Sequence, residues 1–72
     1  METESLTFGE RLRLARTRKG LKQSDLGMSK GFISDVENGK RDMSGKKIVQ
    51  VCKILGVTPN WVLLGKEDNS EK

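Results

Sequence analysis

Amide, hydroxyl and cationic side chains recur at short intervals through the middle of this sequence. They include Gln23, Ser29, Lys30, Ser34, Asn38, Lys40, Arg41, Lys46 and Lys47. Lysine and arginine neutralise phosphates, whereas amides and hydroxyls donate to phosphate oxygens or to base edges. Any one of these lysines could equally belong to a solvated charged surface. Because several cations border one short segment, we interpret the group as a candidate nucleic-acid contact.

The residues that catalysis or metal binding would need are scarce. The chain has no histidine or tyrosine, and no residue near Cys52 in the sequence could activate its thiol. A zinc site therefore lacks a ligand set, and the segment 27–31 lacks the spacing of a phosphate-binding loop. We expect no enzyme, no metal and no cofactor, and we expect Cys52 to be a small core residue.

Charge is distributed unevenly along the 72 residues. Lysine and arginine total 14 against 10 acidic residues, which gives a formal net charge of +4. Half of the acidic residues lie near the two ends: Glu2, Glu4, Glu67, Asp68 and Glu71. The central part is therefore more basic than the whole chain, which suits an anionic partner.

The location of the protein can be predicted from what the sequence lacks. A lone cysteine cannot form an internal disulfide, which favours a reducing compartment. No apolar run approaches the ~18 residues of a membrane span, and the acidic start does not resemble a signal peptide. We expect a cytoplasmic, nucleoid-associated protein with no membrane contact.

Local capping patterns predict the helices that must position these side chains. Thr7 and Glu10 have the spacing of a capping box, and Phe8, Leu12 and Ala15 form an apolar stripe behind it. A first helix is therefore predicted at about 8–19, where Gly20 supplies a left-handed end.

Serine or threonine caps and glycine terminators predict four further short helices. These occupy 23–26, 29–38, 44–55 and 58–64, and no strand pattern is present. Two short helices joined by a tight turn that contains glycine are typical of a helix-turn-helix. We expect an all-α bundle at 7–65 between a flexible arm at 1–6 and a disordered tail at 66–72.

The stretch from Gln23 to Gly39 resembles the helix-turn-helix of the Cro and phage-repressor family. Matching pieces occur in the right order over roughly residues 7–65. They are Gly20-Leu21-Lys22-Gln23, Ile33-Ser34, Glu37-Asn38-Gly39, Lys40-Arg41, Ser44, Ile48, Leu55-Gly56-Val57 and Trp61. The resemblance implies a compact five-helix, lambda-repressor-like DNA-binding domain. It also implies an ion pair between Arg16 on the first helix and Glu37 at the end of the third.

The sequence departs from this family at two places. About four residues are missing between Leu26 and Ile33, which removes roughly one turn and predicts a shortened second helix. Lys22 stands where the family often has a serine or threonine cap. The missing turn affects the geometry of base readout more than the fold.

The resemblance implies that the helix beginning near Ser29 enters the major groove of DNA. Lys30 and Ser34 are then candidates for base or phosphate contacts, with Asn38 further along the same helix. Gly31 either allows close backbone approach or is simply a small surface residue. Asp35 either accepts from cytosine N4 or points aside, and we favour the second.

Residues outside this helix complete the predicted interface. Gln23 is a candidate for phosphate contact because it opens a helix, and helix N-termini attract anions. Lys40, Arg41, Lys46 and Lys47 are candidates for clamping neighbouring phosphates.

A second surface is predicted near the end of the chain. Trp61 and Leu64 are expected to close the core, whereas Leu63 and Leu14 are expected to remain exposed and to contribute to a homodimer.

The function predicted from these features is sequence-specific DNA binding by a prokaryotic or phage transcriptional regulator, most simply a repressor. The expected partner is a palindromic operator bound by a homodimer. The competing hypothesis is a protein-interaction module or antitoxin-like adaptor on the same fold, with weakened DNA readout.

Overall fold

The computed structural model describes residues 3–65, and all the regular structure in this range is helical, without any strand. The elements are η1 (Thr3–Ser5), α1 (Phe8–Arg18), η2 (Gln23–Leu26), α2 (Lys30–Glu37), α3 (Gly45–Leu55) and α4 (Pro59–Leu64). The predicted all-α class and the five predicted segments are confirmed, but the second segment is a 3-10 turn and not an α-helix. None of the helices described between residues 3 and 65 is long and apolar enough to cross a bilayer.

Each α-helix begins at the capping residue that the sequence predicts. The Thr7 hydroxyl accepts from the Glu10 backbone N–H at 3.2 Å, and the Glu10 carboxylate accepts from the Thr7 N–H at 2.9 Å. Ser29, Ser44 and Thr58 cap the later helices through the same third-residue N–H. These contacts satisfy backbone donors that a helix leaves free at its start, so they fix the helix boundaries locally.

The core forms where α1, α2, α3 and α4 turn their apolar stripes inward. Its almost fully buried side chains are Leu12, Leu26, Ile33, Val36, Val51 and Val62. Met43, in the loop before α3, is also buried although no helical pattern marks it. Cys52 is buried as predicted, and burial raises the pKa of its thiol.

Two predictions about the ends of the domain are wrong. Leu64 is 59% exposed and does not close the core, because Val62 is the fully buried residue of α4. Trp61 is half-buried and packs against the core, as predicted. Residues Thr3–Ser5 form a 3-10 turn where no regular structure was expected. The predicted tail at 66–72 lies outside the described residues.

Arg11 connects three segments and is buried despite its charge. Its Nε donates to the Val62 carbonyl and its Nη2 to the Leu63 carbonyl, both at 2.7 Å, and its Nη1 donates to the Leu6 carbonyl. The two bonds to α4 satisfy carbonyls at the end of a helix, where a cation is also favoured by the helix dipole. Arg11 therefore holds α4 and the segment before α1 against the rest of the domain.

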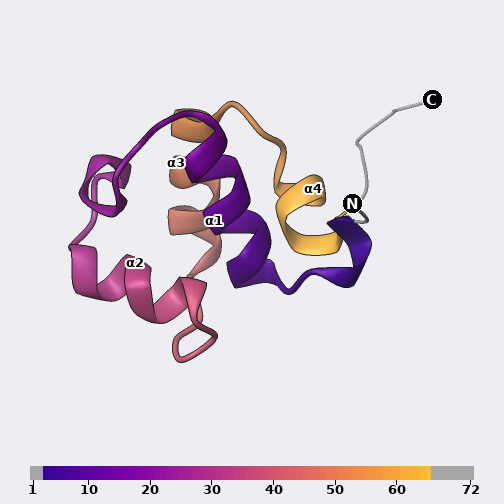
Figure 1. Cartoon of the computed structure of the whole chain (residues 1–72), viewed down its shortest axis with the longest axis horizontal. Coiled ribbons are helices and arrows are strands. Elements are labelled where there is room, and N and C mark those ends of the chain that lie inside the picture. The colour runs from indigo at the N-terminus through magenta and orange to yellow at the C-terminus, as the bar shows by residue number, and fades with distance from the viewer. Residues whose placement is uncertain (1–2, 66–72) are drawn as a thin grey trace.

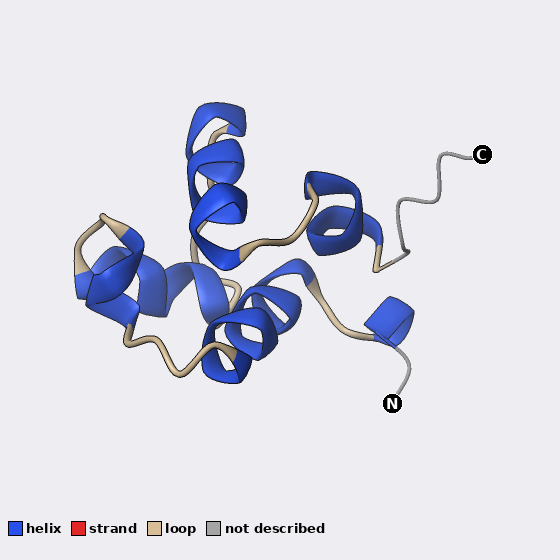
Figure 2. Cartoon of the chain, turned by 90° about the horizontal axis from the view of Figure 1, so that it is seen from above, coloured by secondary structure: helices blue, strands red, loops and turns tan. Residues whose placement is uncertain are grey.

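The helices divide the molecule into two ends (Figures 1 and 2). η2 and α2 lie at one end, and α4 and η1 lie at the other, with α1 and α3 between them. Gly9 sets the spacing of α1 and α2, because a Cβ atom there would lie 2.4 Å from the Val36 carbonyl oxygen and 2.6 Å from that of Glu37. The end formed by η2 and α2 carries most of the predicted contact residues.

Candidate nucleic-acid interface

Helix α2 buries one face and presents the other. Ile33 and Val36 are almost fully buried, whereas Lys30 and Gly31 are exposed. Ser34 and Asp35 are half-buried at the edge of the exposed face. The Ser29 hydroxyl accepts from the Phe32 N–H at 3.2 Å, so its oxygen is used in capping and its proton remains a donor. The start of α2 therefore offers polar groups to whatever lies against this end of the molecule.

A depression of about 560 Å³ lies beside the start of α2. Its lining includes Ser29, Gly31, Asp35, Arg41 and Lys47, of which Lys47 comes from α3. The structure thus brings together four of the predicted contact residues that are scattered over nineteen positions of the sequence.

Phe32 lies in the same depression and contacts both of its cations. The Lys47 Nζ is 4.5 Å from the centroid of the Phe32 ring, and the Arg41 guanidinium carbon is 5.8 Å from it. Cations attracted to a ring face in this way are held near the rim rather than dispersed in solvent. The half-buried ring of Phe32 packs against the core and also positions these two charges.

A second depression, of about 420 Å³, lies at the far end of α2. Arg13 of α1, Asn38 and Arg41 line it, together with the acidic residues Glu10, Glu37 and Asp42. Nothing in the sequence separates Arg13 from the other cations of the first helix, because only the packing of α1 on α2 directs it to this place. Arg13 therefore joins the candidate interface.

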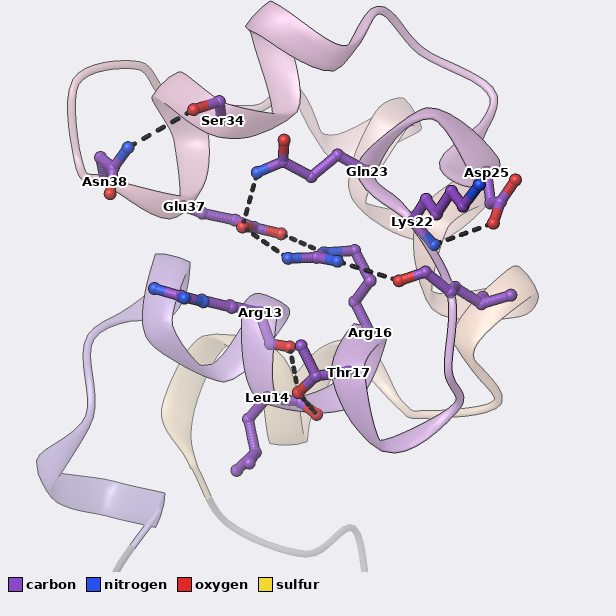
Figure 3. Close-up of polar contacts among 11 residues, drawn as sticks. Arg13, Leu14, Arg16, Thr17, Lys22, Gln23, Asp25, Ser34, Glu37 and Asn38 are labelled. Atoms are coloured by element: carbon purple, nitrogen blue, oxygen red, sulfur yellow. Dashed lines mark hydrogen bonds and ion pairs between the residues drawn. The ribbon is translucent and has the colours of Figure 1, made fainter.

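Beneath the exposed face, a nearly buried ion pair connects α1 with α2 (Figure 3). The Arg16 Nε and Glu37 Oε2 are 2.7 Å apart, and their side chains are 11% and 3% exposed. A second contact joins Arg16 Nη2 to Glu37 Oε1 at 3.2 Å, and Arg16 Nη1 donates to the Leu21 carbonyl at 2.9 Å. The two-pronged geometry fixes the end of α2 relative to α1.

Gln23 belongs to this network. Its side-chain amide donates to Glu37 Oε1 at 3.1 Å, and Figure 3 shows it reaching from η2 toward the carboxylate. The phosphate contact predicted for Gln23 therefore has to use the remaining amide hydrogen or the start of η2. This structural role was not visible in the sequence, because Gln23 and Glu37 are separated by 14 positions.

The other predicted residues are less concentrated. Ser34 and Asn38 lie one turn apart and are joined by a long hydrogen bond of 3.5 Å. Lys40 is exposed in the turn after α2, and Lys46 is exposed in the first turn of α3, but neither lines the two depressions.

The shortened second element keeps the features that the motif needs. Leu26 is fully buried, and the Asp25 carboxylate accepts from the Lys22 N–H at 2.8 Å, which supplies half of a capping box without a serine or threonine. Gly27 ends the turn with φ +78°, a conformation that favours glycine and redirects the chain toward α2. Four residues and one left-handed glycine thus replace the longer helix that the family usually has.

Known proteins match both the sequence and the fold. The chain is 36% identical to the HTH-type transcriptional regulator DicA of Escherichia coli over 74 positions, which cover 94% of the chain and 53% of DicA. The chain thus spans about half the length of this curated relative. Because the aligned stretch is longer than the chain itself, DicA has residues there that this chain lacks.

Two solved structures share the arrangement of helices. The P22 c2 repressor, solved in complex with a synthetic operator, superposes with a TM-score of 0.80 at 27% identity, over 86% of this chain and all of that one. The restriction-modification controller protein C.AhdI of Aeromonas hydrophila gives a TM-score of 0.72 at 35% identity, over 78% and 91% of the two chains. The model of the helix-turn-helix domain family matches residues 7–62, and the chain belongs to that family.

Proposed function

We propose that this protein is a sequence-specific DNA-binding transcriptional regulator, acting as a repressor, with α2 placed in the major groove. The observation that carries this proposal is the exposed start of α2 beside a depression whose rim holds Arg41 and Lys47. A helix in the groove reads base edges with its N-terminal side chains, while flanking cations bind the phosphates.

Each group of residues receives a role in this proposal. Lys30 donates to guanine acceptors, and Ser29 and Ser34 donate to bases or phosphates. Arg41, Lys47 and Arg13 neutralise phosphates on either side of α2. Lys40 and Lys46, which are exposed nearby, extend the same contact, and Gly31 allows the DNA to approach closely because nothing in the protein lies within 4 Å of its missing Cβ.

We also propose that the protein binds as a homodimer to a palindromic site. Leu63 and Leu64 expose 46% and 59% of their surface at the end of α4, and such adjacent apolar side chains offer a surface that a second copy of the chain would cover. A two-fold dimer would present two copies of α2 about 34 Å apart, one turn of DNA. Such a regulator acts on DNA in the cytoplasm.

The decisive experiment is binding to random-sequence duplex DNA across a salt series, followed by selection of preferred sequences. Phosphate binding predicts that the logarithm of the association constant falls with the logarithm of salt, with a slope of about 0.9 per neutralised phosphate. Enrichment of one palindrome would support a sequence-specific regulator, whereas absence of binding at low salt would refute the proposal.

Two lysines of α3 provide a matched pair of variants. Lys47→Gln removes a cation from the depression, and we expect it to reduce the salt slope by about 0.9. Lys53→Gln removes an exposed cation from the last turn of the same helix, outside both depressions, and should leave the slope unchanged. Equal effects of the two substitutions would mean that net charge, and not this surface, governs binding.

The alternative function is a protein-interaction module, and the same leucines favour it. A partner held by Leu63 and Leu64 would bind with little dependence on salt, and Lys47→Gln would not weaken it. The salt series therefore distinguishes the two functions with one set of variants.

A further inference from the structure

Asp35 is an acidic residue on a surface that otherwise suits phosphate. It follows Gly31 by four positions, so the two residues share one face of α2, and both line the depression beside the start of that helix. The Asp35 side chain is 44% exposed. Asp35 therefore lies at the candidate interface, where its charge has to be accommodated.

Arg41 compensates this charge. Arg41 Nε lies 3.6 Å from Asp35 Oδ2, and the Arg41 side chain is 61% exposed beside the Phe32 ring. The turn between them is also fixed, since the Lys40 backbone N–H donates to the Asp35 carbonyl at 2.7 Å. An exposed pair of this kind contributes little to stability and separates easily when either partner finds a better contact.

We propose that Asp35 is a specificity-determining residue that exchanges Arg41 for an amino group on a base edge, which releases Arg41 to a phosphate. The amino group is that of cytosine or adenine, because these are the hydrogen-bond donors in the major groove that a carboxylate can accept from. Where the DNA offers no such donor, Asp35 keeps Arg41 or lies unpaired near phosphates, and either state weakens binding. Asp35 thereby couples the reading of one base to one phosphate contact.

This inference rests on the proposed DNA-binding function and is tested with Asp35→Asn against two targets, random duplex and the best selected site. Asparagine removes the repulsion and the ion pair. Affinity for random duplex should rise about fivefold, the factor that Coulomb's law gives for two unit charges roughly 4 Å apart in water. The salt slope should rise by about 0.9, because Arg41 becomes available to phosphate. Affinity for the selected site should rise by less than about twofold, so the selectivity ratio falls. Repeated selection should shift toward adenine at one base position, because asparagine keeps one acceptor oxygen and adds a donor.

Two further variants separate this mechanism from a general effect of charge. Asp42→Asn makes the same charge change at an exposed residue that lines the second depression but lies outside α2, so it should raise the affinity for both targets equally. In an Arg41→Gln background, Asp35→Asn should no longer increase the salt slope.

The possible results distinguish failure of this inference from failure of the proposed function. The inference is overturned if Asp35→Asn behaves like Asp42→Asn, or if its slope increase persists without Arg41. If the wild-type protein binds neither target, the proposed function itself fails. Circular dichroism of each variant, compared with wild type, confirms that the helices are intact.

Discussion

Gly9 gives the sharpest test of how this domain is packed. Replacing it with alanine places a Cβ atom 2.4 Å from the Val36 carbonyl oxygen and 2.9 Å from the Glu37 carbonyl carbon. Both neighbours are backbone atoms at the end of α2, and they cannot rotate away as a side chain would. Relief requires α1 and α2 to separate by the better part of an ångström, which also disturbs the nearby Arg16–Glu37 pair.

Two opposing effects determine the magnitude. Forcing one extra methyl group into a packed contact costs about 1–3 kcal/mol, and rigid backbone neighbours place Gly9→Ala at the upper end. Alanine in a helix gains up to about 1 kcal/mol over glycine, and less in the first turn. We therefore expect a net loss of roughly 2 kcal/mol, or a decrease in Tm on the order of 10 °C for a domain of this size.

Urea and thermal unfolding followed by circular dichroism at 222 nm would measure the change. Gly31→Ala is the matched control, because Gly31 is likewise the second residue of a capped helix but has no atom within 4 Å of its missing Cβ. That variant should be as stable as wild type or more so. If Gly9→Ala also left the stability unchanged or raised it, the close approach of α1 to α2 would be refuted.

Two further predictions concern buried groups. Glu37→Gln leaves the nearly buried Arg16 without its charged partner, so we expect the free energy of unfolding to fall by about 3 kcal/mol in the same assay. At the exposed pair, Asp35→Asn should lower it by under about 1 kcal/mol, and similar losses for the two variants would contradict the difference in burial. Burial raises the pKa of the Cys52 thiol above its ordinary value of 9.0, so the thiol favours the folded state below about pH 9 and loses this contribution as the pH rises through the folded pKa. Unfolding measured from pH 7 to 10.5 should therefore show a steeper loss of stability for wild type than for Cys52→Ala, and parallel curves would argue against a buried thiol.

The helices were predictable from sequence because their boundaries depend on contacts three or four residues apart. The Thr7–Glu10 box and the caps at Ser29, Ser44 and Thr58 are local chemistry, and each falls where it was predicted. The same applies to the shortening of η2, which follows from the early position of Gly27.

Contacts between distant segments were not predictable in this way. Nothing in the sequence distinguishes Arg11 from a surface cation, because two of its carbonyl partners are more than 50 positions away along the chain. Leu64 was assigned to the core because α4 is only six residues long, too short for periodicity to distinguish its faces. The pairing of Arg16 with Glu37 came from the family resemblance, since spacing alone relates no two residues 21 positions apart.

For the candidate site, sequence predicted the kinds of residue but not their grouping. The packing of α1 and α3 on α2 selects Arg13 and Lys47 from among the many cations and places them beside α2. The contact between Asp35 and Arg41 depends on how the turn after α2 folds back.

The position of Arg11 has a practical consequence for anything attached to this protein. The Arg11 guanidinium binds both Leu6 and the last turn of α4. As a result, η1 and α4 lie at the same end of the molecule, away from α2 (Figures 1 and 2). A fluorophore, a surface tether or a fused domain joined there would stand clear of DNA bound at α2 but would lie beside Leu63 and Leu64, the proposed dimer contact. Two labels, one on η1 and one on α4, would report the separation of these segments when the Arg11 contacts break.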